Sequence, residues 1–366
     1  MRVKHITLRK EATYFNLKNV LIAMSGGVDS SAVAYLMKSQ GYSCLGATMR
    51  LYTNGAEGCV KEKDIEDAKK VCDLLKIEHR VVDFSSDFDK YVICNFINAY
   101  ENGFTPNPCI ECNFRLKFDK LFEYAEENGY DHIATGHYAI TEYSEKYGRV
   151  VLKKATDQSK DQSYVLYRIS KDRLGRVMFP LGAITSKSET RELAKQLGVD
   201  ISSKKDSQDI CFVPNGDYAK FIEEYTGKKY PEGDFIRFDG KYLGKHKGII
   251  RYTIGQRKGL GLALDRSMYV VDKDLEKNQI IIGDTEHLMK KELYARDVNL
   301  LAVDNLDTPM RVKAKIRYKQ EEKDAYAVME NGLLHVVFDE EQRAISKGQS
   351  VVLYDGDIVI GGGIIS

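Results

Sequence analysis

A glycine turn between an apolar strand and an amphipathic helix constrains the fold of this chain more than any other segment. Residues 19–24 form an apolar run, residues 25–27 read Ser-Gly-Gly, and apolar residues then recur at helical spacing until Gly41. A strand that turns directly into a helix is the building unit of a parallel sheet. We therefore expect an α/β fold at the start of the chain.

The same alternation continues to about residue 198. The sequence predicts further strands at residues 44–49, 80–84 and 132–135, with helices at 65–75, 88–96, 118–125 and 186–197. The last of these helices begins with the capping pattern of residues 186–189. Alternating strands and helices require right-handed crossovers and a parallel sheet that is covered on both faces. The first part of the chain is therefore predicted to be a doubly wound α/β domain.

The second half of the chain predicts antiparallel structure. From residue 235 onward, short alternating segments are separated by the hairpin-type pairs Asp239-Gly240, Asn331-Gly332 and Asp355-Gly356. Dense glycine at residues 240–261 favours a small central α+β domain, and the end of the chain favours a small β-barrel. We expect an N-terminal extension at residues 1–19, a catalytic domain at 20–205, a central domain at 206–280 and a C-terminal β-barrel at 281–366.

Charge and hydropathy exclude several classes of protein. The 366 residues include 55 Lys and Arg against 54 Asp and Glu, so a nucleic acid would have to be bound by local basic patches. No apolar run approaches the ~20 residues of a membrane span. Residues 1–19 lack the apolar core of a secretory signal. We expect a monomeric cytoplasmic protein that does not enter a membrane.

Three of the seven cysteines are candidates for chemistry. Cys109 and Cys112 form a C-x-x-C after the proline-containing loop 105–108, just before a predicted helix whose N-terminus would lower a thiol pKa. Cys211 lies in the distant segment 206–212. A structural zinc site would need a second pair of ligands, and none follows. The remaining cysteines are expected to be ordinary core residues, namely Cys44, Cys59, Cys72 and Cys94.

The glycine turn is suited to binding phosphate. Backbone N–H groups and the helix dipole meet an anion at such a strand-to-helix turn. The turn has no Lys in the Walker position, so it is not an ordinary P-loop. The alternative is a structural turn in which Ser and Asp only cap the helix. The motif Ser-Gly-Gly-x-Asp-Ser at residues 25–30 resembles the pyrophosphatase loop (PP-loop) of enzymes that cleave ATP between its α and β phosphates and transfer AMP.

With these motifs, the sequence resembles the tRNA-specific 2-thiouridylase family over nearly the whole chain after residue 19. The signature at residues 252–261 belongs to the same resemblance. It implies an adenine nucleotide alpha-hydrolase-like PP-loop domain, a small central domain and a C-terminal barrel that contacts RNA. The implied ATP-binding residues are Ala23, Met24, Ser25, Gly26, Gly27, Val28, Asp29, Ser30, Met49 and Gly136. Asp29 would either position Mg²⁺ or pyrophosphate, or only cap the helix.

The resemblance also implies roles for the thiols and for residues that contact tRNA. Cys112 would be the catalytic cysteine, and Cys211 would carry a persulfide. Asn107, Pro108 and Cys109 would face the target base. The full set of implied tRNA contacts is Asn107, Pro108, Cys109, His137, Lys160, Asp161, Gln162, Arg317, Tyr318 and Gln349.

The implied reaction is the 2-thiolation of uridine. ATP adenylates the C2 oxygen, the Cys211 persulfide attacks C2 in place of AMP, and Cys112 releases thiouridine as a Cys112–Cys211 disulfide forms. The sulfur donor would be a cysteine desulfurase or a sulfur-relay protein. The family's usual target, the wobble uridine of Lys, Glu and Gln tRNAs, is expected by analogy.

One position departs from the commonest form of the family, which has Asp where this chain has Cys109. Three thiolates with an open fourth position are the ligand set of a four-iron, four-sulfur cluster whose unique iron holds a sulfide. The sequence favours such a cluster, with Cys109, Cys112 and Cys211 as its metal ligands. The persulfide cycle requires only Cys112 and Cys211, and it stays open as the alternative.

A basic segment near the C-terminus is a candidate RNA-binding surface. Strict alternation predicts a strand over residues 311–319 with five cations on one face, ~6.6 Å apart. Its alternative is the solvated face of an antiparallel sheet. The five cations are Arg311, Lys313, Lys315, Arg317 and Lys319. Further basic positions that would extend this surface are Lys153, Lys154, Lys160, Arg168, Lys171, Arg173, Lys204 and Lys205.

Two other functions compete with tRNA thiolation. A PP-loop enzyme of the same class could adenylate a small molecule and form an amide, and it would need neither the three cysteines nor a basic barrel. A non-catalytic RNA-binding protein could use the glycine turn as a nucleotide sensor. Assays of pyrophosphate, AMP and thiolated nucleoside distinguish the three.

Overall fold

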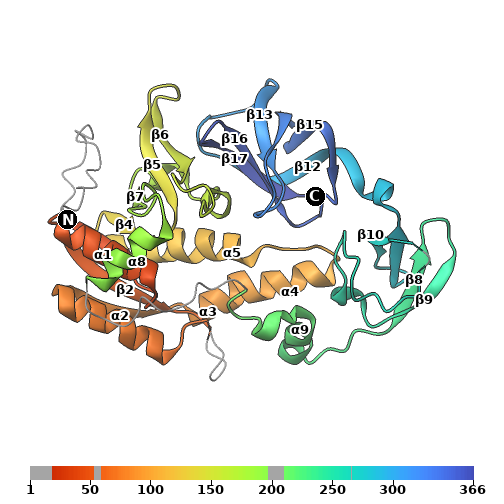
Figure 1. The fold of residues 1–366 in the computed structure, drawn as a ribbon, viewed down its shortest axis with the longest axis horizontal. Helices are drawn as coiled ribbons and strands as arrows, with labels where there is room; N and C mark the ends of the chain where they lie inside the picture. The colour runs from red at the N-terminus through yellow and green to blue at the C-terminus, as the bar shows by residue number, and fades with distance from the viewer. Residues whose placement is uncertain (1–18, 53–58, 197–209, 265) are drawn as a thin grey trace.

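The computed structural model describes residues 19–52, 59–196, 210–264 and 266–366. The described residues form three sheets (Figure 1). The C-terminal barrel lies above helices α4 (Cys94–Glu101) and α5 (Pro108–Glu111), and the small central sheet lies at one end of the molecule. Within the described residues, no helix is both long enough and apolar enough to cross a membrane.

The first sheet is parallel, as expected for a doubly wound domain. Its strand order is β3 (Glu78–Asp83), β2 (Ser43–Arg50), β1 (Asn19–Ala23), β4 (His132–Ala134) and β7 (Val177–Met178). The side chains of β1 alternate between two buried layers, which is why this strand is apolar throughout. Val20 and Ile22 pack toward α1 (Val28–Ser39), α2 (Glu62–Leu75) and α8 (Lys187–Lys195), whereas Leu21 packs on the opposite face.

Two long helical runs cover that opposite face. One runs through α3 (Ser85–Phe88), the π-helical η2 (Asp89–Ile93) and α4; the other runs through α5, the π-helical η3 (Cys112–Lys120) and α6 (Leu121–Glu127). The residues at the junctions keep right-handed helical angles, so each run is continuous. π-Helical stretches inside α-helices occur frequently at functional sites.

A hairpin leaves the first domain and joins the C-terminal sheet. Strands β5 (Ala139–Ser144) and β6 (Arg149–Lys154) are antiparallel, and β6 pairs with β17 (Ile358–Ile365) at Lys153 and Ile358. The sequence predicted only a parallel sheet in this part of the chain, so this hairpin was missed. The short helices η4 (Ser163–Leu166) and α7 (Lys171–Leu174) follow it.

The central region holds α9 (Tyr218–Thr226) and a four-stranded sheet. The strand order is β10 (Tyr269–Asp274), β11 (Gln279–Gly283), β8 (Gly233–Arg237) and β9 (Tyr242–His246). The turn predicted at Asp239-Gly240 joins β8 to β9, and Gly240 has a φ of 90°. Short helices lie at η5 (Pro214–Gly216), η6 (Ile249–Arg251) and η7 (Thr285–Leu288).

The C-terminal strands close into a barrel. They run in the order β12 (Met289–Leu300), β15 (Leu333–Arg343), β14 (Lys323–Glu330), β13 (Met310–Lys315), β16 (Ser350–Asp355) and β17, and β12 pairs with β17 to complete the ring. The turn between β14 and β15 has φ values of 51° at Asn331 and 80° at Gly332, which is why this Asn-Gly pair suits a hairpin. The expected fold class is therefore confirmed.

The barrel shares buried side chains with the first domain. Tyr164, Tyr167 and Tyr354 are all fully buried. The Tyr164 hydroxyl donates to the Ser350 carbonyl over 2.8 Å, and the Tyr167 hydroxyl lies 3.0 Å from Ser350 Oγ. The two regions are thus held together by apolar burial with satisfied polar groups.

A second buried junction fixes the segment that follows the undescribed residues 197–209. The Phe212 ring is 1% exposed and packs at 5.7 Å from Phe88, 5.2 Å from Phe96 and 5.2 Å from Phe221. We call these four rings the Phe212 cluster. It attaches the segment beginning at Ile210 to helices α3, α4 and α9.

Phe212→Ala should lower the free energy of unfolding by about 3–5 kcal/mol, because it removes a large side chain from a closed core. It should also make Cys211 more reactive toward maleimide, since the neighbouring ring no longer anchors it. Phe338→Ala is the matched control: Phe338 is also 1% exposed but lies in the barrel. Urea unfolding and timed labelling measure the two effects. Equal Cys211 labelling in both variants would contradict this role for Phe212.

Candidate active site

The glycine turn has the geometry of an anion-binding loop. Gly26 has a φ of 69°, and a Cβ atom added there would lie 2.1 Å from the Asp64 carbonyl oxygen. Only glycine fits this position, because both the backbone angle and the space exclude a side chain. The Ser30 hydroxyl lies 3.2 Å from Ser25 Oγ and donates to the Gly27 carbonyl at 3.1 Å, which holds the turn closed.

The predicted ATP-binding residues gather at one edge of the parallel sheet. Ala23 ends β1, Met49 lies near the end of β2, and Gly136 follows β4. A Cβ atom on Gly136 would lie 3.0 Å from Asp29 Cβ, so the loop after β4 packs directly against the start of α1. Ligands of open α/β sheets bind at the carboxyl ends of the strands, where this group lies.

Asp29 is held by a lysine that the sequence did not single out. Lys187 Nζ lies 2.6 Å from Asp29 Oδ1 and 2.8 Å from Oδ2. The Tyr138 hydroxyl donates to the same Oδ1 at 2.9 Å. The Lys187 side chain is only 13% exposed, so this ion pair is largely shielded from water. Asp29 therefore joins α1 to the first turn of α8, and its side chain does not cap α1.

The C-x-x-C pair opens a continuous helical run. Asn107 is the N-cap of α5, and its side-chain oxygen accepts a hydrogen bond from the Cys109 backbone N–H at 3.2 Å. The lowered thiol pKa expected from this helix start is wrong. Burial raises the pKa of Cys112 to about 12, and loss of solvation also raises the pKa of Cys109. At both thiols the loss of solvation is the largest cause and outweighs the lowering of the pKa by the charge of Lys117.

Cys211 lies beside a cysteine that was expected to be an inert core residue. The Sγ atoms of Cys59 and Cys211 are 2.9 Å apart. Cys59 is partly buried, and its backbone N–H donates to the Tyr52 carbonyl at 3.0 Å. Cys59 packs against the core as expected, but its sulfur also contacts Cys211, which the sequence did not indicate. Cys72 is fully buried and matches the expectation of a core residue, whereas Cys94 is exposed.

Of these thiols, Cys211 is the one held toward the thiolate form. The sulfur contact with Cys59 lowers the pKa of Cys211, and the positive charge of Lys117 lowers it further. The same contact raises the pKa of Cys59, and burial raises it further. The Lys117 charge also lowers the pKa of Cys109 and of Cys112, although burial raises both more strongly. One cation therefore favours the thiolate form of all three predicted thiols.

The predicted metal ligands do not fit a cluster as they are placed here. Among the residues that the structure describes, no three His, Cys, Asp or Glu side chains are grouped so that they could hold a metal ion. The sulfur of Cys211 contacts Cys59, which lies outside the predicted ligand set of Cys109, Cys112 and Cys211. Among the described residues, Asp29 is likewise not part of a group that could hold Mg²⁺. Both of its carboxylate oxygens lie within hydrogen-bond distance of Lys187 Nζ.

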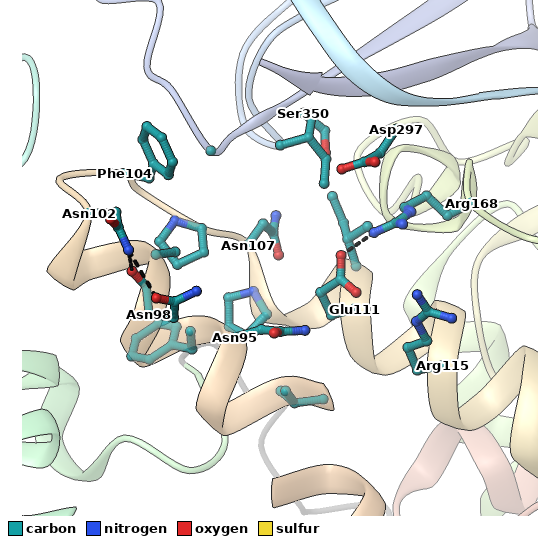
Figure 2. Close-up of a pocket in the computed structure, with 18 of the residues that line it drawn as sticks. Asn95, Asn98, Asn102, Phe104, Asn107, Glu111, Arg115, Arg168, Asp297 and Ser350 are labelled. Atoms are coloured by element: carbon teal, nitrogen blue, oxygen red, sulfur yellow. Dashed lines mark hydrogen bonds and ion pairs between the residues drawn. The ribbon is translucent and has the colours of Figure 1, made fainter. Parts of the chain in front are cut away.

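A cavity of about 360 Å³ lies between α4, the loop before α5 and the barrel. Figure 2 shows side-chain amides and an ion pair around it. Its labelled lining residues include Asn95, Asn98, Asn102, Asn107, Glu111, Arg115, Arg168 and Ser350. Neither Cys109 nor Cys112 lines it, because the helical run turns Glu111 toward the cavity and the thiols elsewhere. Asn107 and Pro108 are the predicted base-facing residues that the cavity includes, and Cys109 is not among its lining residues.

The barrel holds the loop that carries Asn107. Gln349 Nε2 donates to the Thr105 carbonyl at 2.8 Å, and the Thr105 N–H donates to the Lys347 carbonyl at 2.8 Å. Arg317 donates to the Ala344 carbonyl at 2.6 Å and so supports the same barrel segment. Gln349 and Arg317, two predicted tRNA contacts, are thus engaged within the protein.

Other predicted tRNA contacts also stabilise a loop. Asp161 accepts hydrogen bonds from the N–H groups of Ala155 and Ser163, and Gln162 Oε1 accepts from the Tyr138 N–H at 2.9 Å. The Tyr318 hydroxyl donates to the Asp161 carbonyl at 3.2 Å. Lys160 lies at the start of this loop and is half-buried.

His137 follows the parallel strand β4 in the same neighbourhood. Its Nδ1 lies 2.8 Å from Thr135 Oγ1, and its ring packs between Phe118 and Phe179. Burial holds the pKa of His137 well below its ordinary value, so the ring is neutral at physiological pH. A neutral ring can offer a hydrogen bond but not a charge to RNA.

The predicted ribbon of five cations is wrong in its second half. Strand β13 ends at Lys315, so Arg317 and Lys319 lie in the following turn. Within the strand, Arg311 pairs with Asp339 at 2.5 Å, and Lys313 lies 3.2 Å from Asp324. Most of the further basic positions are paired too: Lys153 with Glu142, Lys154 with Glu322, Arg168 with Glu111, Lys171 with Asp304 and Arg173 with Asp119. Lys204 and Lys205 lie outside the described residues.

Three side chains of this region were missed from the sequence. Lys187 and Lys117 carry no motif of their own, and their roles depend on which residues the fold brings near them. A single sequence does not show whether either lysine keeps a conserved spacing from the glycine turn or from the C-x-x-C. Cys59 was visible as a cysteine, but only the fold shows that it meets Cys211.

Comparisons with known proteins match the whole described architecture. The family model described as the tRNA methyl transferase HUP domain matches residues 18–215. The models described as the tRNA methyl transferase PRC-barrel domain and the aminomethyltransferase beta-barrel domain match residues 219–284 and 290–365. The three matched segments correspond to the first domain, the central region and the C-terminal barrel.

Curated relatives match over nearly their full length. The tRNA-specific 2-thiouridylase MnmA of Acetivibrio thermocellus is 48% identical over 356 residues, covering 95% of this chain and 99% of that protein. That of Clostridioides difficile is 47% identical over 358 residues, covering 96% and 99%. A solved structure of a 4-thiouridine synthetase–RNA complex with bound ATP is 18% identical to this chain, with a TM-score of 0.36. The match covers 56% of this chain and 50% of that one, and this likeness is too weak to support a conclusion about function. The chain belongs to the tRNA-specific 2-thiouridylase family.

Proposed function

We propose that this protein catalyses the ATP-dependent 2-thiolation of a uridine in tRNA. The C2 oxygen of uridine attacks the α-phosphorus of ATP and releases pyrophosphate, and a sulfur nucleophile then replaces that oxygen and releases AMP. The observation that carries this proposal is the match to curated 2-thiouridylases, which are 47–48% identical to this chain over 99% of their own length. The electrostatic effect of Cys211 on Cys112, from a distant segment, also supports it.

The glycine turn is the proposed ATP site. Residues 23–30, with Met49 and Gly136, would bind the nucleotide and its phosphates, with ATP entering as its magnesium complex. The backbone N–H groups at the start of α1 supply donors that need no charged side chain. The shielded Asp29–Lys187 pair keeps α1 and α8 in register beside that site.

The target nucleotide is proposed to approach the loop that carries Asn107. Asn107, Pro108 and Cys109 would contact the base, and the tRNA contacts would include His137, residues 160–162, Arg317, Tyr318 and Gln349. A base inside a stack presents no free C2 edge to a thiol, so the uridine must be extruded from its loop. The cavity beside Asn107 offers amides and an Arg168–Glu111 pair for neighbouring nucleotides.

Sulfur transfer is proposed to start at Cys211. Its lowered pKa gives a thiolate that accepts sulfur from a cysteine desulfurase or relay protein and becomes Cys211–S–SH. The outer sulfur attacks C2, and AMP leaves with the C–O bonding pair. Cys112 then attacks Cys211 Sγ, so that a Cys112–Cys211 disulfide forms and 2-thiouridine leaves with the electron pair. An external thiol reduces the disulfide.

The four-iron, four-sulfur alternative stays a prediction. The three thiols do not fit a cluster as placed here, so no step is derived through one. Iron and sulfide analysis after anaerobic purification distinguishes the two versions. The wobble uridine of Lys, Glu and Gln tRNAs as target, a monomeric state and a cytoplasmic location are likewise proposed by analogy with the family.

Cys112→Ser and Cys211→Ser should each lower tRNA thiolation by about a thousandfold or more, because each removes a nucleophile that the cycle uses. ATP- and tRNA-dependent pyrophosphate release should survive, since adenylation precedes sulfur transfer. Cys94→Ser is the control at an exposed cysteine of α4. Nucleoside mass spectrometry and a pyrophosphate assay measure both steps. Thiolation that persists in either variant, or pyrophosphate release that ignores RNA, would contradict the proposal.

Gly26→Ala should weaken ATP binding by about tenfold or more, because its Cβ atom would displace the turn from the Asp64 carbonyl. Gly41→Ala is the matched control: Gly41 also has a positive φ, of 86°, but nothing lies within 4 Å of an added Cβ atom. It should cost about 1–2 kcal/mol of stability and leave ATP affinity unchanged. Calorimetric titration and thermal unfolding separate the effects. Normal ATP affinity in folded Gly26→Ala protein would exclude this loop as the site.

The thiols should differ in the pH at which they alkylate. The lowered pKa of Cys211 predicts reaction with iodoacetamide on the acid side of the ordinary thiol range, near ~8.5. Cys112, with its pKa raised to about 12, should react slowly through neutral pH and faster only as the pH rises. Cys44, raised to about 11 by burial, is an internal reference. Peptide mass spectrometry after timed labelling gives each rate. Cys112 reacting before Cys211 at pH 7 would show the assignment to be reversed.

A further inference from the structure

Cys59 is not used in the proposed cycle, although it is the thiol in contact with Cys211. The two Sγ atoms lie 2.9 Å apart, and a disulfide bond is ~2.05 Å long, so the pair closes with a movement of about 1 Å. Among the described residues, no other two cysteines make a sulfur–sulfur contact of this kind. The resolving thiol Cys112 is near enough to act electrostatically on Cys59, but it makes no such contact.

The contact between Cys59 and Cys211 is built into the packing. The Cys59 N–H bonds to the Tyr52 carbonyl at 3.0 Å, and the Tyr52 ring packs edge-on against Phe221 at 6.2 Å. Phe221 belongs to the Phe212 cluster, whose central ring directly follows Cys211. Both thiols are therefore attached to one aromatic cluster, although they lie 152 residues apart in the sequence.

We propose that Cys59 resolves a persulfide on Cys211 when no adenylated uridine takes the sulfur. This inference rests on the proposed function, because it needs Cys211 to be the residue that accepts sulfur. Cys59 is then a second catalytic thiol, which discharges the loaded enzyme. It competes with Cys112 for the same atom, Cys211 Sγ.

The step balances without an outside oxidant. The Cys59 sulfur attacks Cys211 Sγ in Cys211–S–SH, and the bond between Cys211 Sγ and the outer sulfur breaks. The outer sulfur leaves with the electron pair and takes the Cys59 proton, so hydrogen sulfide is released. The outer sulfur is reduced by two electrons, and the two cysteines are oxidised to a Cys59–Cys211 disulfide. The external thiol that resets the main cycle also reduces this disulfide.

The geometry decides which thiol acts when substrate is absent. Without tRNA, the thiol in contact with Cys211 is Cys59, so discharge through Cys59 requires the smaller movement. Discharge through Cys112 would require Cys211 to leave this contact first. The enzyme thus releases unused sulfur as sulfide and leaves Cys112 reduced.

The test uses the full-length protein without tRNA or ATP, loaded with inorganic polysulfide under argon and quenched with N-ethylmaleimide in acid. Peptide mass spectrometry should find a Cys59–Cys211 disulfide that forms in step with sulfide release. Cys59→Ser should abolish this linkage and slow sulfide release by about tenfold or more, because the nucleophile is gone. Cys72→Ala, at another cysteine of the same region, should change neither.

A Cys112–Cys211 linkage in place of the Cys59 linkage, or unchanged sulfide release in Cys59→Ser, would overturn the inference. Glutathione disulfide gives a second route to the same pair, because Cys59 would displace glutathione from Cys211. Failure of both reagents to give the linkage in the unaltered chain also overturns it, whether or not the variants fold. Thiolation of tRNA is assayed separately. A protein that thiolates tRNA but never links Cys59 defeats only this inference, and one that links Cys59 but never thiolates tRNA defeats only the proposed function.

Discussion

The burial of Phe212 is the interaction on which the arrangement of thiols depends. Cys211 directly precedes this ring, which is 1% exposed, so the ring holds Cys211 beside Cys59. Full burial of such a side chain contributes about 1.5–3 kcal/mol to the free energy of folding. This offsets the conformational entropy lost when the one or two residues beside it are ordered. The proposed exchange of Cys211 between Cys59 and Cys112 would leave this apolar anchor in place.

The barrel contributes to the site through the loop that precedes the C-x-x-C. Gln349 and Lys347 bind the backbone of Thr105, and Arg317 supports the barrel segment from which they come. Asn107, the N-cap of α5, lies two residues after Thr105, so the start of this helix is tied to the C-terminal strands. Residues expected to contact tRNA therefore already have a structural role. Binding of RNA at the barrel would act on the same backbone that positions Asn107.

The sequence was sufficient wherever the determining pattern is local. Apolar periodicity and glycine turns predicted the parallel sheet, the C-x-x-C at a helix start and the Asn331-Gly332 hairpin, because each depends on neighbouring residues. Pairing of β6 with β17 was missed, since no local pattern says which distant edge a hairpin will join. The Lys187–Asp29 pair and the Cys59–Cys211 contact were missed for the same reason. The pKa of Cys112 was predicted in the wrong direction, because burial is a property of the fold and not of the helix start.

Paired charges on the surface change how RNA would be bound. The basic side chains predicted to meet phosphates mostly contact carboxylates, as Arg311 does with Asp339 and Lys171 with Asp304. Exposed pairs of this kind contribute about 0–1 kcal/mol, so a phosphate can replace the carboxylate at little cost. Each exchange leaves an acidic side chain next to the RNA, which opposes binding of long duplexes with closely spaced phosphates. A chain with a net charge of +1 is therefore better suited to binding a short, folded RNA loop. In such a loop, contacts to an extruded base supply the binding energy that phosphate contacts do not.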